Sequence, residues 1–298
     1  MITRRELMIG MTAIPAAART RPRVAITMDD VNWRAIPQPF AAGANARLLR
    51  ALSDHGEAKA ALFVIGGNID NDTGRAIVQS WSDAGHLIGN HTWSHRAFGS
   101  KQTDEKTFEA DILRCERAID SFPGFRKYFR FPALKEGATA QQRDSMRAFL
   151  NEHGYRNGHV TVDASDWYYD SRLRARLADD PQFDVNRFRR PYLDHIWQRT
   201  VYYDGLARRV LGRSIPHTLL IHYNLLNALF LADLLSMYRV KGWAVIDAAS
   251  AYSDPVFHRV PQTVPAGESL VWALAKEDGR FDAELRYPRE RRIRKARP

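Results

Sequence analysis

Residues 24–30 read Val24-Ala-Ile-Thr-Met-Asp-Asp30, an apolar, partly β-branched run that ends in two adjacent acids. Such a run predicts a buried strand of a parallel sheet, with the acids at its carboxyl end. Because side chains alternate along a strand, neighbouring aspartates point in different directions and can have different roles. We therefore expect one of them to bind a cation and the other to remain free as a base.

Two histidines four residues apart follow the acids, in His91-Thr-Trp-Ser-His95. One carboxylate and two imidazoles can hold a divalent ion and leave positions open for water and for a substrate carbonyl. The ion lowers the pKa of its water, and an unligated carboxylate removes the proton. Either motif alone is more often a cap, a solvated turn or a chance spacing. The prediction of a metal-dependent hydrolase rests on both motifs together.

The net charge of +10 is concentrated at the two ends of the chain. Residues 1–23 hold five arginines against one glutamate, and residues 286–298 hold seven arginines and lysines against one glutamate, which leaves residues 24–285 neutral. A neutral body indicates no basic surface for nucleic acid, so a nucleic-acid-binding protein is the weakest alternative. We expect residues 286–298 to be a solvated, disordered tail.

The N-terminal residues predict a bacterial export signal. Arg4 and Arg5 form a twin-arginine start, a short apolar stretch follows, and Pro15-Ala-Ala-Ala18 offers small-residue cleavage positions. We expect residues 1–22 to direct the protein to the periplasm or out of the cell, and a mature N-terminus near Arg19 would confirm this. Neither the short apolar stretch nor any later one is long enough for an integral membrane segment.

Short apolar runs alternate with amphipathic stretches in the body of the chain, which predicts parallel strands joined by crossover helices. Strands are expected at 24–27, 60–65, 86–90, 128–131, 158–162, 218–222 and 243–246, and helices at 45–55, 74–84, 104–121, 140–153 and 226–241. About seven such units predict an α/β fold with a barrel-like sheet. Residues 167–212 depart from the pattern with aromatic and arginine-rich helical material.

The polar residues of greatest chemical interest follow predicted strand ends, where the active sites of barrel folds lie. They are Asp29, Asp30, His91, His95, Arg130, Asp163, Asp166 and His222. This convergence is a stronger indication of a site than any single motif.

Five motifs in this order resemble those of the polysaccharide deacetylase family, the metal-dependent carbohydrate esterases that include chitin and peptidoglycan deacetylases. They are Thr27-Met-Asp-Asp30, His91-Thr-Trp-Ser-His95, Arg130-Phe-Pro132, Asp163-Ala-Ser-Asp166-Trp167 and Leu219-Leu-Ile-His222. The resemblance implies a distorted (β/α)7-type barrel. It also implies a catalytic domain at residues 23–253, and we expect residues 254–285 to pack on it as an extension.

The resemblance further implies a role for each motif residue. The implied metal ligands are Asp30, His91 and His95, for a divalent ion with zinc as the first choice. The implied catalytic residues are Asp29 as base, Arg130 as its brace, His222 as general acid, and Asp166, or in second place Asp163, as the partner of His222. The expected substrate pocket comprises Trp167, Leu220 and Pro132.

Three positions depart from the family pattern. Met28 replaces the usual phenylalanine and is tolerable, because methionine fills irregular apolar space. Val31 replaces a glycine, and because valine does not easily adopt positive φ, we expect the loop beyond Asp30 to take another path. Ala133 stands where an aromatic residue is common, so a sugar-stacking wall would be missing there.

The predicted function is removal of acetyl groups from N-acetylated sugar units of a polysaccharide or oligosaccharide by metal-bound water. The alternatives are an O-deacetylase or other small-amide hydrolase, or a degenerate module that only binds polysaccharide. A binding-only site has no need for both Asp29 and His222, which disfavours the module. The polymer and the oligomeric state stay open.

Overall fold

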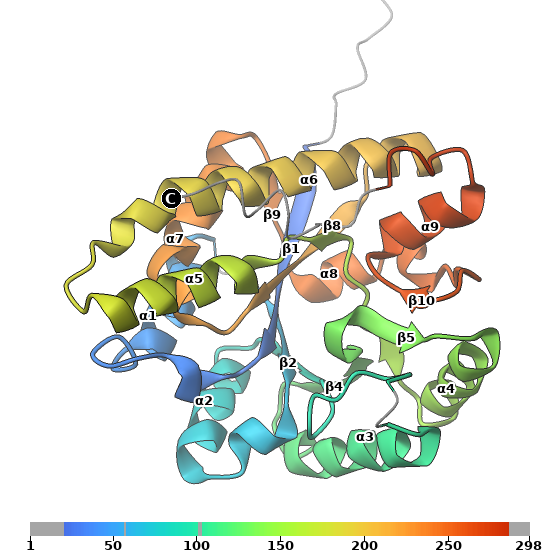
Figure 1. The fold of residues 1–298 in the computed structure, drawn as a ribbon, viewed down its shortest axis with the longest axis horizontal. Coiled ribbons are helices and arrows are strands. Elements are labelled where there is room, and N and C mark those ends of the chain that lie inside the picture. The colour runs from blue at the N-terminus through green and yellow to red at the C-terminus, as the bar shows by residue number, and fades with distance from the viewer. Residues whose placement is uncertain (1–20, 57, 101–102, 286–298) are drawn as a thin grey trace, which may run out of the picture.

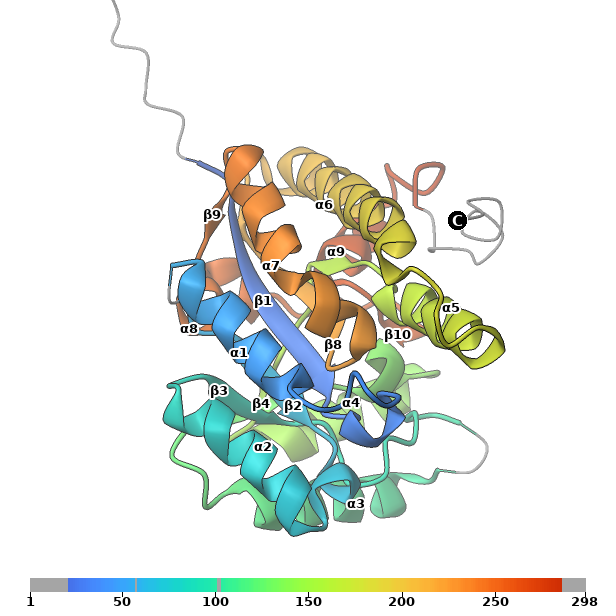
Figure 2. The same cartoon turned by 90° about the vertical axis from the view of Figure 1, so that its left-hand side faces the viewer.

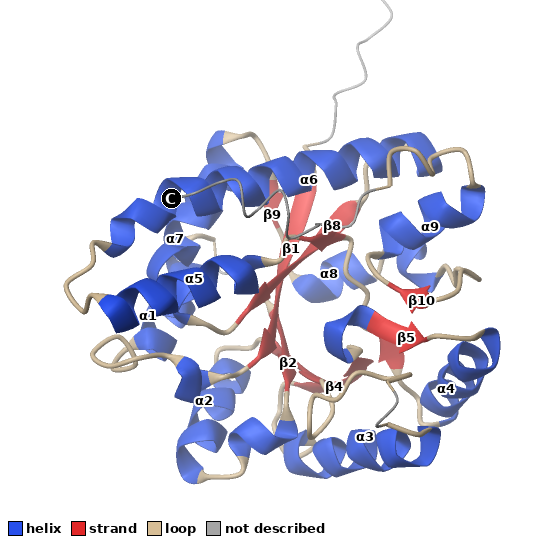
Figure 3. Ribbon diagram, in the orientation of Figure 1, coloured by secondary structure: helices blue, strands red, loops and turns tan. Residues whose placement is uncertain are grey.

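A curled parallel sheet forms the centre of the molecule (Figures 1 and 3). The computed structural model describes residues 21–56, 58–100 and 103–285. The expected export signal, apart from its last two residues, and the expected basic tail lie outside the described residues. In the described part of the chain, no helix is both long and apolar enough to cross a membrane.

Seven parallel strands form the path of the sheet, in the order β6, β4, β3, β2, β1, β8 and β7. Their bounds are β1 Arg23–Asp30, β2 Ala61–Val64, β3 Leu87–Asn90, β4 Phe125–Phe129, β6 Arg156–Asn157, β7 Val162–Asp163 and β8 Pro216–His222. Strands β6 and β7 lie at the two ends of this path and, among the described residues, do not pair with each other, so the sheet is an open half-barrel. The predicted α/β fold with a barrel-like sheet is confirmed.

Nine helices of the described chain surround the sheet. They are α1 Ala44–Asp54, α2 Asp72–Asp83, α3 Glu105–Ile119, α4 Ala140–Glu152, α5 Asp166–Asp179, α6 Arg189–Leu211, α7 Leu225–Val240, α8 Ala248–Tyr252 and α9 Leu270–Asp278. Helices α1 and α7 pack side by side against the outer face of β1 (Figure 2). The irregular region that follows Trp167 forms α5 and the long α6, and Pro191 lies in the first turn of α6, where proline is tolerated.

Two predicted strands differ in the structure. The strand expected at 158–162 is replaced by the short strands β6 and β7 with extended chain between them, because the chain there crosses the open side of the half-barrel. The strand expected at 243–246 is the two-residue β9, Ala244–Val245, which pairs with β1 beside the main path and does not extend the barrel. Strand β10, Ala266–Gly267, pairs antiparallel with β5, Lys135–Gly137.

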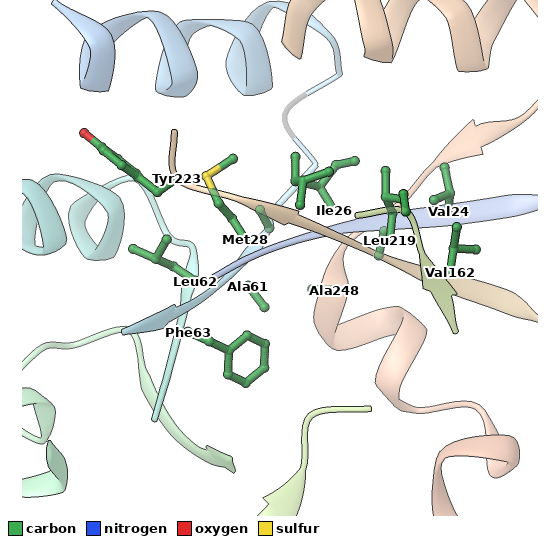
Figure 4. Close-up of a cluster of buried hydrophobic side chains, with 14 of the residues drawn as sticks. Val24, Ile26, Met28, Ala61, Leu62, Phe63, Val162, Leu219, Tyr223 and Ala248 are labelled. Atoms are coloured by element: carbon green, nitrogen blue, oxygen red, sulfur yellow. The ribbon is translucent and has the colours of Figure 1, made fainter. Parts of the chain in front are cut away.

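The alternation of side chains along β1 separates the core from the site. Figure 4 shows Val24, Ile26 and Met28 on the helix side of the strand, in the main hydrophobic cluster. Thr27 and Asp29 therefore face the interior of the half-barrel. Both faces of β1 are buried, as is usual for a central parallel strand.

Phe63 of β2 fills the interior of the half-barrel (Figure 4). Its ring lies below the guanidinium of Arg130, whose central carbon is 4.1 Å from the ring centroid. Glycines make room for the ring, because a Cβ atom at Gly158 would lie 2.4 Å from Phe63, and one at Gly89 would lie 2.7 Å from it. The floor of the site thus depends on two positions without side chains.

We predict that Gly158→Ala destabilises the protein, because the new methyl group forces Phe63 out of its place below Arg130. The expected loss in free energy of unfolding is about 1–3 kcal/mol. Gly205→Ala is the matched control, since a Cβ atom at Gly205 in α6 meets nothing within 4 Å. Denaturant unfolding of both variants measures the difference. Equal stability of the two would show that Phe63 moves freely.

Candidate active site

Asp29 is fixed by a buried ion pair with Arg130. Arg130 Nη1 donates to Asp29 Oδ1 at 2.9 Å, and the two residues are 1% and 2% exposed. The other guanidinium nitrogens also have partners: Nε donates to the carbonyl of Gly158, and Nη2 donates to Thr27 Oγ1 and the hydroxyl of Tyr252. A buried charge is tolerated only with partners of this kind. Arg130 therefore holds the Asp29 carboxylate in one orientation.

Asp30 turns away from its neighbour through a left-handed backbone. Its φ is 83°, and φ of Val31 is 53°, so the expectation that Val31 avoids positive φ is wrong. Such a conformation in a β-branched residue costs about 1–3 kcal/mol and persists only where the surroundings impose it. Here Val31 is fully buried, and Asn68 Nδ2 donates to the carbonyl of Asp30 at 2.9 Å.

His91 and His95 present their Nε2 atoms to Asp30. Each Nε2 lies 3.5 Å from Asp30 Oδ1. His91 Nδ1 donates to the carbonyl of Arg130 at 2.7 Å, and since a carbonyl only accepts, Nδ1 carries a proton and Nε2 is the nitrogen that faces Asp30. Positive φ values at Thr92 and His95 shape this loop.

These three side chains fit a divalent metal ion. One ligand atom from each lies within 4.8 Å of the others. Separations of 3.5 Å are too long for hydrogen bonds, but suit two ligand atoms that each lie about 2.1 Å from one ion in tetrahedral geometry. Asp30 Oδ1 is buried and has no hydrogen-bond partner among the described residues. A buried acceptor without a donor is costly, and a cation would satisfy it.

The electrostatics of the group suit a cation as well. Burial raises the pKa of Asp30, but the adjacent imidazoles of His91, His222 and His95 outweigh it, so the net pKa lies well below the ordinary value. Burial, together with the neighbouring imidazole of His91, lowers the pKa of His95 to about 4. An ionised carboxylate and a neutral imidazole are the forms that bind metal.

His222 stands opposite Asp29 on the neighbouring strand, where the two are register partners in β8 and β1. Asp166 Oδ1 accepts from His222 Nδ1 at 2.7 Å, and Asp166 Oδ2 accepts from the His222 backbone N–H at 3.0 Å. Burial lowers the pKa of His222, but the charge and hydrogen bond of Asp166 and the charges of Asp30 and Asp29 raise it to about 10. His222 is thus a protonated imidazole whose Nε2 is left for other contacts.

Asp166, and not Asp163, is the partner of His222. Asp163 lies in β7, where its Oδ1 accepts from the backbone of Ser165. Asp166 is fully buried at the start of α5. Burial raises its pKa, but the charge of His222 and the donated hydrogen bonds lower it by more.

Two asparagines that the motifs do not include complete this arrangement. Asn224 Nδ2 and Asn227 Nδ2 donate to Asp166 Oδ2 at 3.0 and 2.7 Å. Asn227 Nδ2 also donates to the carbonyl of His222. The signal for Asn224 was in the sequence, because an asparagine before an apolar helix is a common N-cap, and Asn224 caps α7. No sequence pattern indicated the reach of Asn227 to Asp166.

A cavity opens beside the metal ligands and the imidazole of His222. Asp30, His222 and Trp167 are among its lining residues. Trp167 is 46% exposed at its edge. Pro132 and Leu220 are not among the described lining residues, because Pro132 begins a short 3-10 helix and Leu220 is buried within β8. Of the expected pocket residues, the structure brings only Trp167 to this cavity.

The fold is similar to that of solved deacetylases. One is a polysaccharide deacetylase from Bacillus cereus, with a TM-score of 0.53 and 20% identity, covering 76% of this chain and 92% of that one. Another is a peptidoglycan N-acetylglucosamine deacetylase, with a TM-score of 0.51 and 21% identity, covering 78% of this chain and 88% of that one. At these identities the similarity shows the half-barrel fold.

The sequence comparisons agree with the fold. Residues 16–158 match the family model described as polysaccharide deacetylase, which confirms the resemblance. A peptidoglycan-N-acetylglucosamine deacetylase of Bacillus cereus is 27% identical over 121 residues, 41% of this chain and 40% of the relative. One of Listeria monocytogenes is 26% identical over 155 residues, 51% of this chain and 28% of the relative. The matches thus span less than half the length of these relatives.

We predict that the protein binds one divalent ion through Asp30, His91 and His95. A His91→Ala/His95→Ala double variant loses two ligands and should retain less than a tenth of the wild-type metal after dialysis, as measured by elemental analysis. His55→Ala serves as control, because His55 bonds to Ala51 and Ser236 away from the site. Equal metal in the double variant and in the wild type would contradict the assignment.

The raised pKa of His222 predicts a pH effect. An acid must be protonated to donate, so activity falls as the pH rises through its pKa. Asp166→Asn removes the charge that raises this pKa, and the alkaline limb of the kcat/KM profile should therefore move to lower pH. Asp163→Asn should leave the limb in place. The same limb in wild type and Asp166→Asn would exclude His222 as the titrating group.

Proposed function

We propose that the protein is a metal-dependent hydrolase that removes acetyl groups from N-acetylated sugar units of a polysaccharide or oligosaccharide. The observation that carries the proposal is that Asp29, held by Arg130, and His222, held by Asp166, lie next to each other beside one set of metal ligands. Asp29 and His222 are register partners on adjacent strands, and Asp30 with the two histidines lies beside them.

The residues divide the reaction between them. When bound, a divalent ion, with zinc as the first choice for this nitrogen and oxygen ligand set, would acidify water and polarise the acetyl carbonyl. Asp29 takes the proton of the attacking water. Its Oδ1 is bound by Arg130, and its Oδ2 faces the metal ligands, 3.6 Å from His91 Nε2. His222 gives its Nε2 proton to the sugar nitrogen as the carbon–nitrogen bond breaks. The products are acetate and a free amine.

The two braces have different physical tasks. Arg130 offsets the charge of Asp29 inside the half-barrel and holds the base in one orientation before substrate binds. Asp166 binds His222 Nδ1, which directs the donated proton to Nε2. A module that only binds polysaccharide requires neither brace, so both features favour catalysis. O-deacetylation of a sugar ester uses the same groups and is the alternative that substrate screening decides.

Relatives support the proposed substrate class. The proteins of Bacillus cereus and Listeria monocytogenes are named as deacetylases of N-acetylglucosamine in peptidoglycan. A glycan with N-acetylated units is therefore the first substrate to test.

We predict that Asp29→Asn and His222→Ala separate turnover from metal binding. Both variants keep Asp30 and both histidines, so they should bind metal as the wild type does. Acetate release from metal-loaded protein should fall by a factor of about 10²–10⁴, the usual contribution of a positioned acid or base.

Asp30→Asn is the contrasting variant and should lose metal and activity together, because a neutral oxygen is a poorer ligand for a divalent cation. If metal-loaded wild type binds an acetylated glycan but releases no acetate from any, the binding module is the correct account.

A further inference from the structure

The cavity beside the metal ligands and His222 extends to the cationic side chain of Arg174 on α5. Its lining includes Asp30 and His222 near the metal ligands, and Trp167, Asp170 and Arg174 farther along. The last three residues are spaced by three and four positions, so they lie on one face of α5. Helix α5 also supplies Asp166 to His222. The helix that positions the general acid therefore also supplies one wall of the cavity.

Arg174 is oriented by a buried carboxylate. Its Nε donates to Asp170 Oδ2 at 2.7 Å, and Asp170 Oδ1 accepts from the backbone N–H of Leu226 at 3.1 Å. The Asp170 side chain is 6% exposed, whereas that of Arg174 is 38% exposed. Within the described residues, Nη1 and Nη2 of Arg174 have no hydrogen-bond partner. An anchored guanidinium with free donors suits a planar anion, which it can bind with two parallel hydrogen bonds.

The acids that line the cavity do not oppose an anion at this position. Both oxygens of Asp170 are already bound, and its charge is offset by Arg174 itself. Asp30 lies with His91 and His95 at the metal-ligand set. The exposed ring of Trp167 offers an apolar face on which a sugar ring can pack.

We propose that Arg174 binds a carboxylate of the substrate, so that the cavity selects an N-acetylated glycan with an acidic group on or next to the unit that reacts. Arg174 is thus a specificity residue, and Asp170 is the residue that positions it. The inference rests on the proposed function for the identity of the reacting unit. The carboxylate contact itself depends only on the cavity and on the side chains of α5.

The test compares two N-acetylated oligosaccharides that differ only in one carboxylate, which in the second is reduced to the alcohol. Calorimetry with the protein dialysed against buffer that contains zinc should give about tenfold tighter binding of the acidic oligosaccharide. This is the usual contribution of a hydrogen bond to a charged group that is partly exposed. Higher salt should reduce this preference. Arg174→Gln should abolish it. Arg174→Lys keeps the positive charge near Asp170 but cannot form two parallel hydrogen bonds to a carboxylate, and should retain part of the preference.

Arg172→Gln is the matched control, because Arg172 is an exposed arginine of the same helix outside the described lining of the cavity. It removes the same charge and should keep the full preference. Equal affinity of the wild type for both oligosaccharides, or equal loss of preference in the two glutamine variants, would overturn the proposal. Unfolding curves show whether each variant is folded.

Acetate release from the same two oligosaccharides separates this proposal from the proposed function. Release without an Arg174-dependent preference contradicts the carboxylate site and leaves the hydrolase intact. An Arg174-dependent preference in binding without any release supports the carboxylate site and contradicts the hydrolase.

Discussion

The buried ion pair between Arg130 and Asp29 is the interaction on which the rest of the site depends. The Arg130 side chain fixes the proposed base, and the Arg130 backbone carbonyl accepts a hydrogen bond from His91 Nδ1. One residue thus orients both the base and a metal ligand. Removal of either partner of such a pair leaves a buried charge and typically costs about 3–5 kcal/mol. The ring of Phe63 packs below the Arg130 guanidinium, and two glycines leave room for this ring.

On the β8 side of β1, a buried carboxylate, Asp166, braces the other catalytic candidate, His222. Asp166 holds His222 and is in turn fixed by Asn224 and Asn227. The two halves meet where Asp29 and His222 are register partners. The metal-ligand set is built on β1 and the segment after β3, and the acid is built on β8, α5 and α7. The pairing of β1 with β8 brings the two halves together.

Much of this arrangement follows from short-range patterns in the sequence. The two-residue period of a strand separates Asp29 from Asp30, and the four-residue spacing identified the two histidines. Their places after predicted strand ends and the family resemblance identified Arg130 and His222, and the structure brings these candidates to one place. Features that depend on distant contacts could not be predicted. Val31 has positive φ where it is fully buried, and Leu220 is buried in β8 and does not line the cavity. The crossing of the open side of the half-barrel replaces a strand that local composition favoured, because only the tertiary fold determines which strands pair.

The central claim is that adjacent aspartates have different tasks because β1 gives them different partners. The most direct measurement is anomalous diffraction from crystals of the protein grown with zinc. The account predicts one peak, about 2.1 Å from an oxygen of Asp30 and from Nε2 of His91 and His95. Asp29 should still be bound to Arg130 and lie outside the coordination sphere. A peak coordinated by Asp29, or bound zinc at a different place, would contradict the account.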